Sequence, residues 1–197
     1  MRVRTLPTPS GGVYRMGMAV PIYYSAEMVR ALPDDGNKYE TVHGELLVTP
    51  APRPWHEEIA IRLLESLRAY TRTNAIGHVF SSQSDISWGL DTLVQPDVFV
   101  VPLEQARTMS WAHMKSLMLA IEVLSPSSVR VDRFTKRRLY QEHIVPVYWA
   151  VDAEELLVET WTPESHFPLI ERERLIWSPT GASEPFTLKL AELFCPI

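Results

Sequence analysis

The stretch LVQPDVFVV (residues 93–101) is followed closely by SLMLAIEVL (residues 116–124), and these two runs decide the fold. Each is almost entirely apolar, and each contains one carboxylate. Strands that are covered on both faces of a sheet have nearly continuous apolar sequences rather than alternating ones. The two runs therefore predict neighbouring strands at the centre of a buried sheet.

The carboxylates in these runs are Asp97 and Glu122. A buried charge costs several kcal/mol unless it is paired, protonated or metal-bound. Two acids on adjacent central strands would converge, and a cation between them would relieve their repulsion. Hard oxygen ligands suit Mg²⁺ or Mn²⁺. As alternatives, Asp97 caps a strand end or accepts hydrogen bonds from loop amides, and Glu122 pairs with an arginine of the adjacent helix.

The rest of the chain supplies helices and strands around this pair. The serine-capped segment 25–32 predicts a short helix, and residues 55–73 carry apolar side chains at helical spacing. Residues 129–143 predict a polar helix with Phe134, Leu139 and Tyr140 on its apolar side. The predicted strands are a hairpin around His43 and Gly44 in 39–50, then 78–88, 93–101, 116–124, 145–152 and 156–162, with one or two more before a closing segment, 187–194. The order is α-β-β-β-α-β, with strands added at both ends.

Composition limits the classes of function. The net charge is −5 and the pI is about 5.7, so the chain lacks the overall basic charge typical of nucleic-acid binders. A local basic surface is still predicted where Arg130, Arg133, Lys136, Arg137 and Arg138 crowd together. No Walker-type glycine loop or GxGxxG is present, and the histidines with Cys195 show no zinc-type spacing.

Location and domain limits follow from simple features. One cysteine allows no internal disulfide, and no run of 18 apolar residues predicts a membrane span, so a cytoplasmic protein is expected. Pro, Gly and Ser interrupt residues 1–22, which predicts a flexible leader, and Met16 or Met18 are possible alternative starts. Residues 23–197 are expected to form a single domain.

Several motifs together resemble one family. The runs QPDVFVV, IEVLSPSS and DRFTKRRLYQEHIVPVYWAVD, with LPDDGNKYETVHGELLVTPAPRPWH upstream, look like the Uma-two family, domain of unknown function 820. The resemblance extends from about Tyr24 nearly to the C-terminus. It implies the PD-(D/E)XK nuclease superfamily and a restriction-endonuclease-like fold: an α/β (α+β) αβββαβ core with a mixed central sheet flanked by helices.

The resemblance also implies a site. It maps Asp97 and Glu122 to the two metal carboxylates. The superfamily's lysine usually lies two residues after the second carboxylate, where this chain has Leu124, and the family pattern places the lysine instead at Lys136 of the following helix. Glu45 resembles an acid that the superfamily often adds near its site, and the family shares His56.

Each of these side chains also has a structural interpretation. Lys136 follows Asp132 by four residues, the spacing of an exposed helical ion pair. Tyr140 either supports Lys136 or belongs to the core, and Gln95 either contacts the metal's water or a phosphate, or is a strand-edge surface residue. His56 also fits a role in starting its helix. Ser127 or Ser128 caps the helix after Glu122, or Ser125 to Ser128 bind phosphate at that helix entry.

The resulting hypothesis is a Mg²⁺- or Mn²⁺-dependent nuclease that hydrolyses DNA, with Asp97, Glu122 and Lys136 in the centre. Glu45, His56, Gln95 and Tyr140 are auxiliary candidates, and Arg130, Arg133, Arg137 and Arg138 are candidate nucleic-acid contacts. Cutting a duplex usually needs two centres, so a homodimer is expected. The alternatives are a binding or regulatory module of the same fold with weak or no catalysis, and a metal-dependent hydrolase of another phosphate ester.

Overall fold

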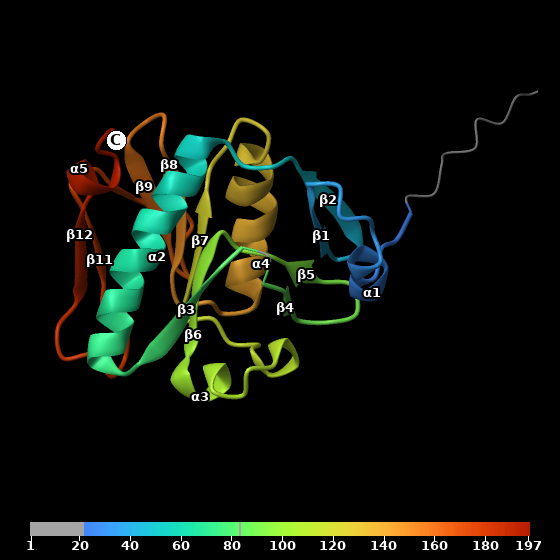
Figure 1. Cartoon of the computed structure of the whole chain (residues 1–197), viewed down its shortest axis with the longest axis horizontal. Coiled ribbons are helices and arrows are strands. Elements are labelled where there is room, and N and C mark those ends of the chain that lie inside the picture. The colour runs from blue at the N-terminus through green and yellow to red at the C-terminus, as the bar shows by residue number, and fades with distance from the viewer. Residues whose placement is uncertain (1–21, 83) are drawn as a thin grey trace, which may run out of the picture.

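A six-stranded mixed sheet forms the centre of the molecule (Figure 1). The computed structural model describes residues 22–82 and 84–197, so the predicted flexible leader lies outside the described residues except for Ile22. Across the sheet the strands are β10 (Leu169–Glu171), β9 (Leu157–Trp161), β8 (Tyr148–Asp152), β7 (Leu119–Val123), β6 (Val98–Pro102) and β3 (Gly77–Ser81).

Only β7 and β8 pair in parallel, and the neighbouring pairs of this sheet are antiparallel. A parallel pair needs a crossover connection. Here the crossover contains η2 (Val131–Lys136), a π-helical segment, which continues directly into α4 (Arg137–Glu142). The predicted α-β-β-β-α-β order is therefore present as α2, β3, β6, β7, η2–α4 and β8, and the predicted mixed sheet with flanking helices is confirmed.

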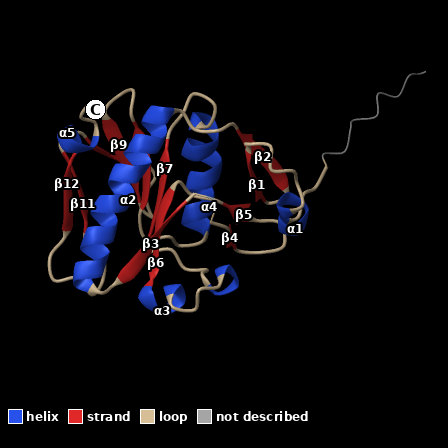
Figure 2. Ribbon diagram, in the orientation of Figure 1, coloured by secondary structure: helices blue, strands red, loops and turns tan. Residues whose placement is uncertain are grey.

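Helices cover both faces of the central sheet (Figure 2). On one face lie α2 (Pro54–Asn74), α5 (Leu190–Leu193) and the hairpin of β11 (Arg174–Trp177) and β12 (Phe186–Lys189). The crossover helix covers the other face. Alternate residues of β6 divide between the two cores, with Val98 and Val100 facing α2 and Phe99 and Val101 facing α4.

A second sheet lies beside the first, in the order β2-β1-β5-β4. Its strands are β1 (Lys38–Val42), β2 (Glu45–Thr49), β5 (Leu93–Val94) and β4 (Ile86–Ser87), and α1 (Ala26–Arg30) packs against β1. Positive φ angles at His43 and Gly44 give β1 and β2 the tight two-residue turn that hairpins favour. The predicted hairpin and the Ser25-capped helix are both confirmed.

The structure corrects two predictions about the strands and the crossover helix. The runs 78–88 and 93–101 are each split, so that β3 and β6 join the central sheet while β4 and β5 join the second one. Pro96 lacks the N–H that an uninterrupted ladder would need there. The predicted one or two strands before the closing segment are β10 and β11, and the closing segment itself forms most of β12 and then α5. Phe134 is 64% exposed and does not belong to the apolar side of its helix.

Two short helical segments, α3 (Leu103–Ala106) and η1 (Trp111–His113), connect β6 to β7. Within the described residues, no helix combines the length and apolarity needed to cross a membrane.

Candidate active site

Asp97 and Glu122 lie side by side because of the register of β6 and β7. Val98 is opposite Ile121, and continuing this antiparallel register by one residue places Asp97 opposite Glu122. Opposed residues of paired strands point to the same face of a sheet. The amide of Val123 also donates to Asp97 Oδ2 at 2.9 Å, which fixes the carboxylate at the end of β6. The structure thus brings the two acids together, on the face that the crossover helix covers.

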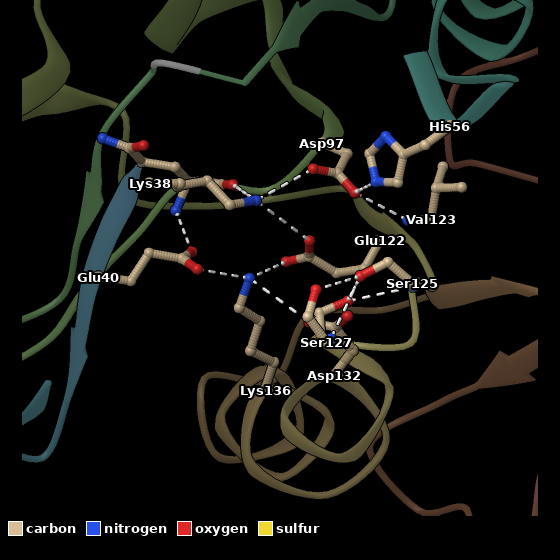
Figure 3. Close-up of polar contacts among 12 residues, drawn as sticks. Lys38, Glu40, His56, Asp97, Glu122, Val123, Ser125, Ser127, Asp132 and Lys136 are labelled. Atoms are coloured by element: carbon tan, nitrogen blue, oxygen red, sulfur yellow. Dashed lines mark hydrogen bonds and ion pairs between the residues drawn. The ribbon is translucent and has the colours of Figure 1, made fainter. Parts of the chain in front are cut away.

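The crossover helix contributes three side chains to the cluster around Glu122. Asp132, Lys136 and Tyr140 recur every four residues, so they lie along one helix face. Lys136 Nζ is 2.9 Å from Glu122 Oε1 and 3.6 Å from Asp132 Oδ1, and the Tyr140 hydroxyl donates to Glu122 Oε1 at 2.8 Å. Lys136 does pair with Asp132, but its side chain is only 2% exposed, so the pair is not on the surface as the alternative interpretation expects (Figure 3).

Two residues of β1 complete the cluster, and the sequence analysis did not single out either one. Glu40 Oε2 is 2.8 Å from Lys136 Nζ, a close ionic contact outside hydrogen-bond geometry, and Glu40 Oε1 accepts the Gln95 amide at 2.7 Å. Lys38 Nζ donates to Asp97 Oδ1 at 3.0 Å and to the Gln95 carbonyl at 3.1 Å. The signal was the spacing of Lys38 and Glu40, two residues apart on a hairpin strand, which puts both on one face.

His56 approaches Asp97 from the first turn of α2. Its Nε2 is 3.1 Å from Asp97 Oδ2, and its Nδ1 is buried without a hydrogen-bond partner. Pro54 occupies the first turn, where its missing N–H costs nothing. His56 therefore does more than start its helix, because it also contacts a carboxylate of the cluster.

Other predicted site residues lie elsewhere or act differently. Glu45 is exposed on β2 and does not reach the cluster, because β1 rather than β2 borders it; Glu40 is the acid that the hairpin supplies. Gln95 contributes through its backbone amide and carbonyl, while its side chain donates to Asp85 at 2.9 Å. Glu122 pairs with Lys136, not with an arginine.

The predicted basic surface is divided. Arg133 pairs with Asp152 and Glu159, each at 2.8 Å. Arg137 donates to Gln141 at 2.7 Å and lies over the Trp161 ring. Arg130 and Arg138 are exposed. Two of the four arginines thus have intramolecular partners, which the spacing in the sequence did not reveal.

The serines after β7 form a turn of hydroxyl groups at the helix entry. Ser125 Oγ is within hydrogen-bond distance of the Ser127 and Ser128 hydroxyls, and it accepts the Ser128 amide at 3.2 Å. Ser128 Oγ accepts the Ser125 amide in return, also at 3.2 Å, so Ser125 and Ser128 bond reciprocally at the helix entry.

The buried cluster contains more carboxyl groups than ammonium groups. Four buried carboxyl groups, those of Glu40, Asp97, Glu122 and Asp132, surround two ammonium groups, those of Lys38 and Lys136. Burial raises the pKa of Glu122 to about 8 despite the two lysines, and burial also raises the pKa of Asp132. Burial opposes ionisation of Asp97 as well, but Lys38 and His56 outweigh it and hold its pKa well below its usual range.

A cleft of about 770 Å³ gives access to this cluster. Its wall contains Asp97, Glu122, Asp132, Lys136, Lys38 and His56, and also Ser125 to Ser128. Carboxylates outnumber cationic side chains along the cleft, with Asp34, Glu57, Asp85, Asp97, Glu122 and Asp132 against Arg30, Lys38, Arg53 and Lys136. A polyanion entering this cleft would therefore need an additional cation.

The donor atoms fit a divalent ion in chemistry. Asp97 Oδ1 and Glu122 Oε2 lie 3.0 and 3.9 Å from Lys38 Nζ, and carboxylate oxygens are ligands that suit Mg²⁺ or Mn²⁺. In the described part of the chain, no three His, Cys, Asp or Glu residues are already arranged as a metal site. Asp97 and Glu122 are therefore the residues that could hold such an ion.

Comparisons with known proteins identify the fold and the family. A solved structure described as a putative nuclease belonging to DUF820, from Anabaena variabilis ATCC 29413, superimposes with a TM-score of 0.72 and 19% sequence identity, covering 87% of this chain and 97% of that one. The likeness shows the fold. A search of curated proteins gives no match. The model of the Uma2 family, described as "Putative restriction endonuclease", matches residues 26–184. This chain belongs to the Uma2 family.

Proposed function

We propose that the protein is a Mg²⁺- or Mn²⁺-dependent nuclease that hydrolyses phosphodiester bonds in DNA. One observation carries the proposal: Asp97 and Glu122 lie side by side at a cleft, next to the Lys136 ammonium, in a cluster with more carboxyl groups than ammonium groups. That combination of paired acids and an amine is what metal-assisted hydrolysis of a phosphate ester needs. The family membership supports the same class of activity.

The residues of the cluster have different roles in this proposal. Asp97 and Glu122 would hold the ion, which when bound polarises a phosphoryl oxygen and lowers the pKa of its water. Lys136 and Tyr140 both donate to Glu122 Oε1, which leaves Oε2 as the oxygen that faces Lys38 and Asp97. Burial opposes the charge of Lys136, but Glu122 and Glu40 raise its pKa well above the usual value, so this group acts as a fixed positive charge.

Delivery of the amine from a helix replaces the usual position on the strand. Leu124, two residues after Glu122, is a half-buried side chain that packs against the apolar core on this face. The π-helical segment of the crossover ends at Lys136 and brings its Nζ to Glu122 Oε1. Such segments widen a helix by one residue and occur often at functional sites.

The substrate class and the assembly extend this proposal. Arg30 and Arg53 on the cleft wall, with exposed Arg130 and Arg138, are the proposed contacts to the phosphate backbone. Cutting both strands of a duplex takes two centres, so a homodimer is the proposed assembly, and the cytoplasm the proposed location.

The test is cleavage of supercoiled, linear and single-stranded DNA with Mg²⁺ or Mn²⁺. We expect cleavage by the wild type and loss of at least about 100-fold in Asp97→Asn, Glu122→Gln and Lys136→Met. Glu45→Gln, an exposed acid outside the cluster, is the matched control and should keep full activity. Circular dichroism should show that each variant folds. This control is needed above all for Lys136→Met, because Lys136 contacts three carboxylates.

One observation favours a second candidate, a nucleic-acid-binding or regulatory module with weak or no catalysis: an ammonium already lies between the two acids. If the wild type binds Mn²⁺ and DNA but cuts no DNA substrate, the nuclease assignment fails and this candidate replaces it. If the protein hydrolyses a simple phosphodiester but cleaves no DNA, it would instead be a hydrolase of another phosphate ester.

A further inference from the structure

Lys38 occupies the space between the two acids of the centre. Its Nζ is 3.0 Å from Asp97 Oδ1 and 3.9 Å from Glu122 Oε2 (Figure 3). No other cationic group in the described residues contacts both carboxylates, because Lys136 contacts Glu122 from the opposite oxygen, Oε1. Lys38 therefore provides the cation that two adjacent buried acids require.

The same space cannot hold a divalent ion and this ammonium together. An ion bound by both carboxylates would stand between Asp97 Oδ1 and Glu122 Oε2, within about 2.1 Å of each oxygen. The ammonium of Lys38 and the divalent ion would then be two positive charges within a few ångströms of each other. Their repulsion is strong in a partly buried place. Divalent-ion binding and the present position of Lys38 therefore exclude each other.

Lys38 is also placed so that it can leave. It belongs to β1 of the second sheet, and its side chain is 19% exposed on the cleft wall, whereas Lys136 is 2% exposed and enclosed by three carboxylates. A lysine side chain is a flexible four-carbon stem with a compact charge. Moving Lys38 thus breaks two hydrogen bonds, to Asp97 and to the Gln95 carbonyl, without opening the core.

We propose that Lys38 is a built-in counter-ion that occupies the divalent-ion position, so that metal binds to Asp97 and Glu122 only by displacing it. This inference rests on the proposed function, since it assumes that these two acids hold the metal. The displaced ammonium stays on the cleft wall, where it can form an ion pair with the phosphate of an incoming phosphodiester. Substrate and metal therefore favour each other's binding, and the acids are not left as an open site for ions when substrate is absent.

The experiment measures Mn²⁺ affinity by calorimetry at neutral pH on the full chain, without DNA. Lys38→Met removes the competing charge while keeping the length of the stem, and it should bind Mn²⁺ about 10- to 100-fold more tightly than the wild type. Lys38→Arg keeps the charge and should bind no more tightly than the wild type. Arg30→Met removes a positive charge from the same cleft, paired with Asp85, and should change the affinity less than about threefold.

Thermal unfolding gives a second readout that does not depend on activity. Without metal, Lys38→Met should melt below the wild type, because Asp97 and Glu122 lose their counter-charge, and Mn²⁺ should raise its Tm more than it raises that of the wild type. Equal or weaker Mn²⁺ binding by Lys38→Met overturns the inference. If Asp97→Asn still abolishes that binding, the metal site itself stands; if neither wild type nor Lys38→Met binds Mn²⁺, the inference and the metal-dependent function both fail.

Discussion

Glu122 is the residue whose ionisation couples the site to the stability of the fold. Burial raises its pKa from 4.5 to about 8, so the native state keeps a proton that the unfolded chain releases. The stability from this proton is fully present below pH 4.5 and is lost as the pH rises through about 8. Each pH unit in that window is worth about 1.4 kcal/mol for one group.

We therefore expect the unfolding free energy of the metal-free wild type to fall between about pH 5 and pH 8, by about 4 kcal/mol at most. Glu122→Gln cannot ionise and should lack this part of the decline. Asp132, whose raised pKa acts in the same direction, remains in both proteins, so the difference between their denaturation curves isolates Glu122. Parallel pH profiles for the two proteins would contradict the assignment.

Tyr140 offers a test of the support that Glu122 receives. Above about pH 8, where Glu122 is ionised, the Tyr140 hydroxyl donates to a buried carboxylate, a bond worth about 2 kcal/mol. The buried Tyr148 hydroxyl donates to the neutral Asp132 carbonyl at 3.2 Å, a bond worth about 1 kcal/mol. Tyr140→Phe should therefore lower the unfolding free energy more than Tyr148→Phe, and only Tyr140→Phe should weaken Mn²⁺ binding. The same Mn²⁺ affinity in both variants would show that Tyr140 is a core residue only.

At the residue scale, the sequence identifies the acids better than their partners. Asp97 and Glu122 are visible because a carboxylate in an apolar run is costly wherever it is buried. Lys38 and Glu40 carry no such mark, since they lie in an ordinary polar hairpin strand, and their burial depends on a second sheet that the sequence did not predict. The family resemblance indicates Glu45 as the acid of the hairpin, whereas in the structure that acid is Glu40.

At the element scale, the β1–β2 turn depends on two residues with positive φ, His43 and Gly44. Gly44 has φ +81°, and a Cβ there would overlap the Tyr23 ring; Gly36 has φ +87° and open space around it. Gly44→Ala and Gly36→Ala share the backbone strain of about 1–2 kcal/mol. Gly44→Ala should lose about 1 kcal/mol more in urea unfolding because Tyr23 must also move, and equal losses would show that Tyr23 yields freely.

The elements that sequence patterns predict well are those whose signal is local. The amphipathic helix, the hairpin and the Ser25 cap depend on residues close together in the chain. The split of residues 93–101 into β5 and β6 depends on two sheets competing for one stretch of backbone, which is a tertiary effect. Leu93 and Val94 would be apolar in either sheet, so Pro96 is the one feature of the sequence that indicates the split.

At the scale of the molecule, the site joins segments that are far apart in the chain. β1, the start of α2, the end of β6, β7 and the crossover helix each contribute one to three side chains. The central sheet fixes Asp97 and Glu122, while the second sheet carries Lys38. The two acids and the cation between them thus come from different sheets.

The proposed dimer also belongs to this scale, and the sheet edge suggests where it forms. β10 is an outer strand of the central sheet, and Leu169 is 62% exposed on it. An apolar outer strand can pair with another chain, and lysine on such a strand opposes pairing.

If two copies pair there, the wild type should cut both strands of a plasmid and appear as a dimer by light scattering, while Leu169→Lys should be a monomer that only nicks. Leu90→Lys, at an 85% exposed leucine beside the second sheet, is the control and should behave as the wild type. A dimeric Leu169→Lys protein would place the contact elsewhere, and a monomeric wild type that still linearises plasmid in one binding event would remove the need for a second centre.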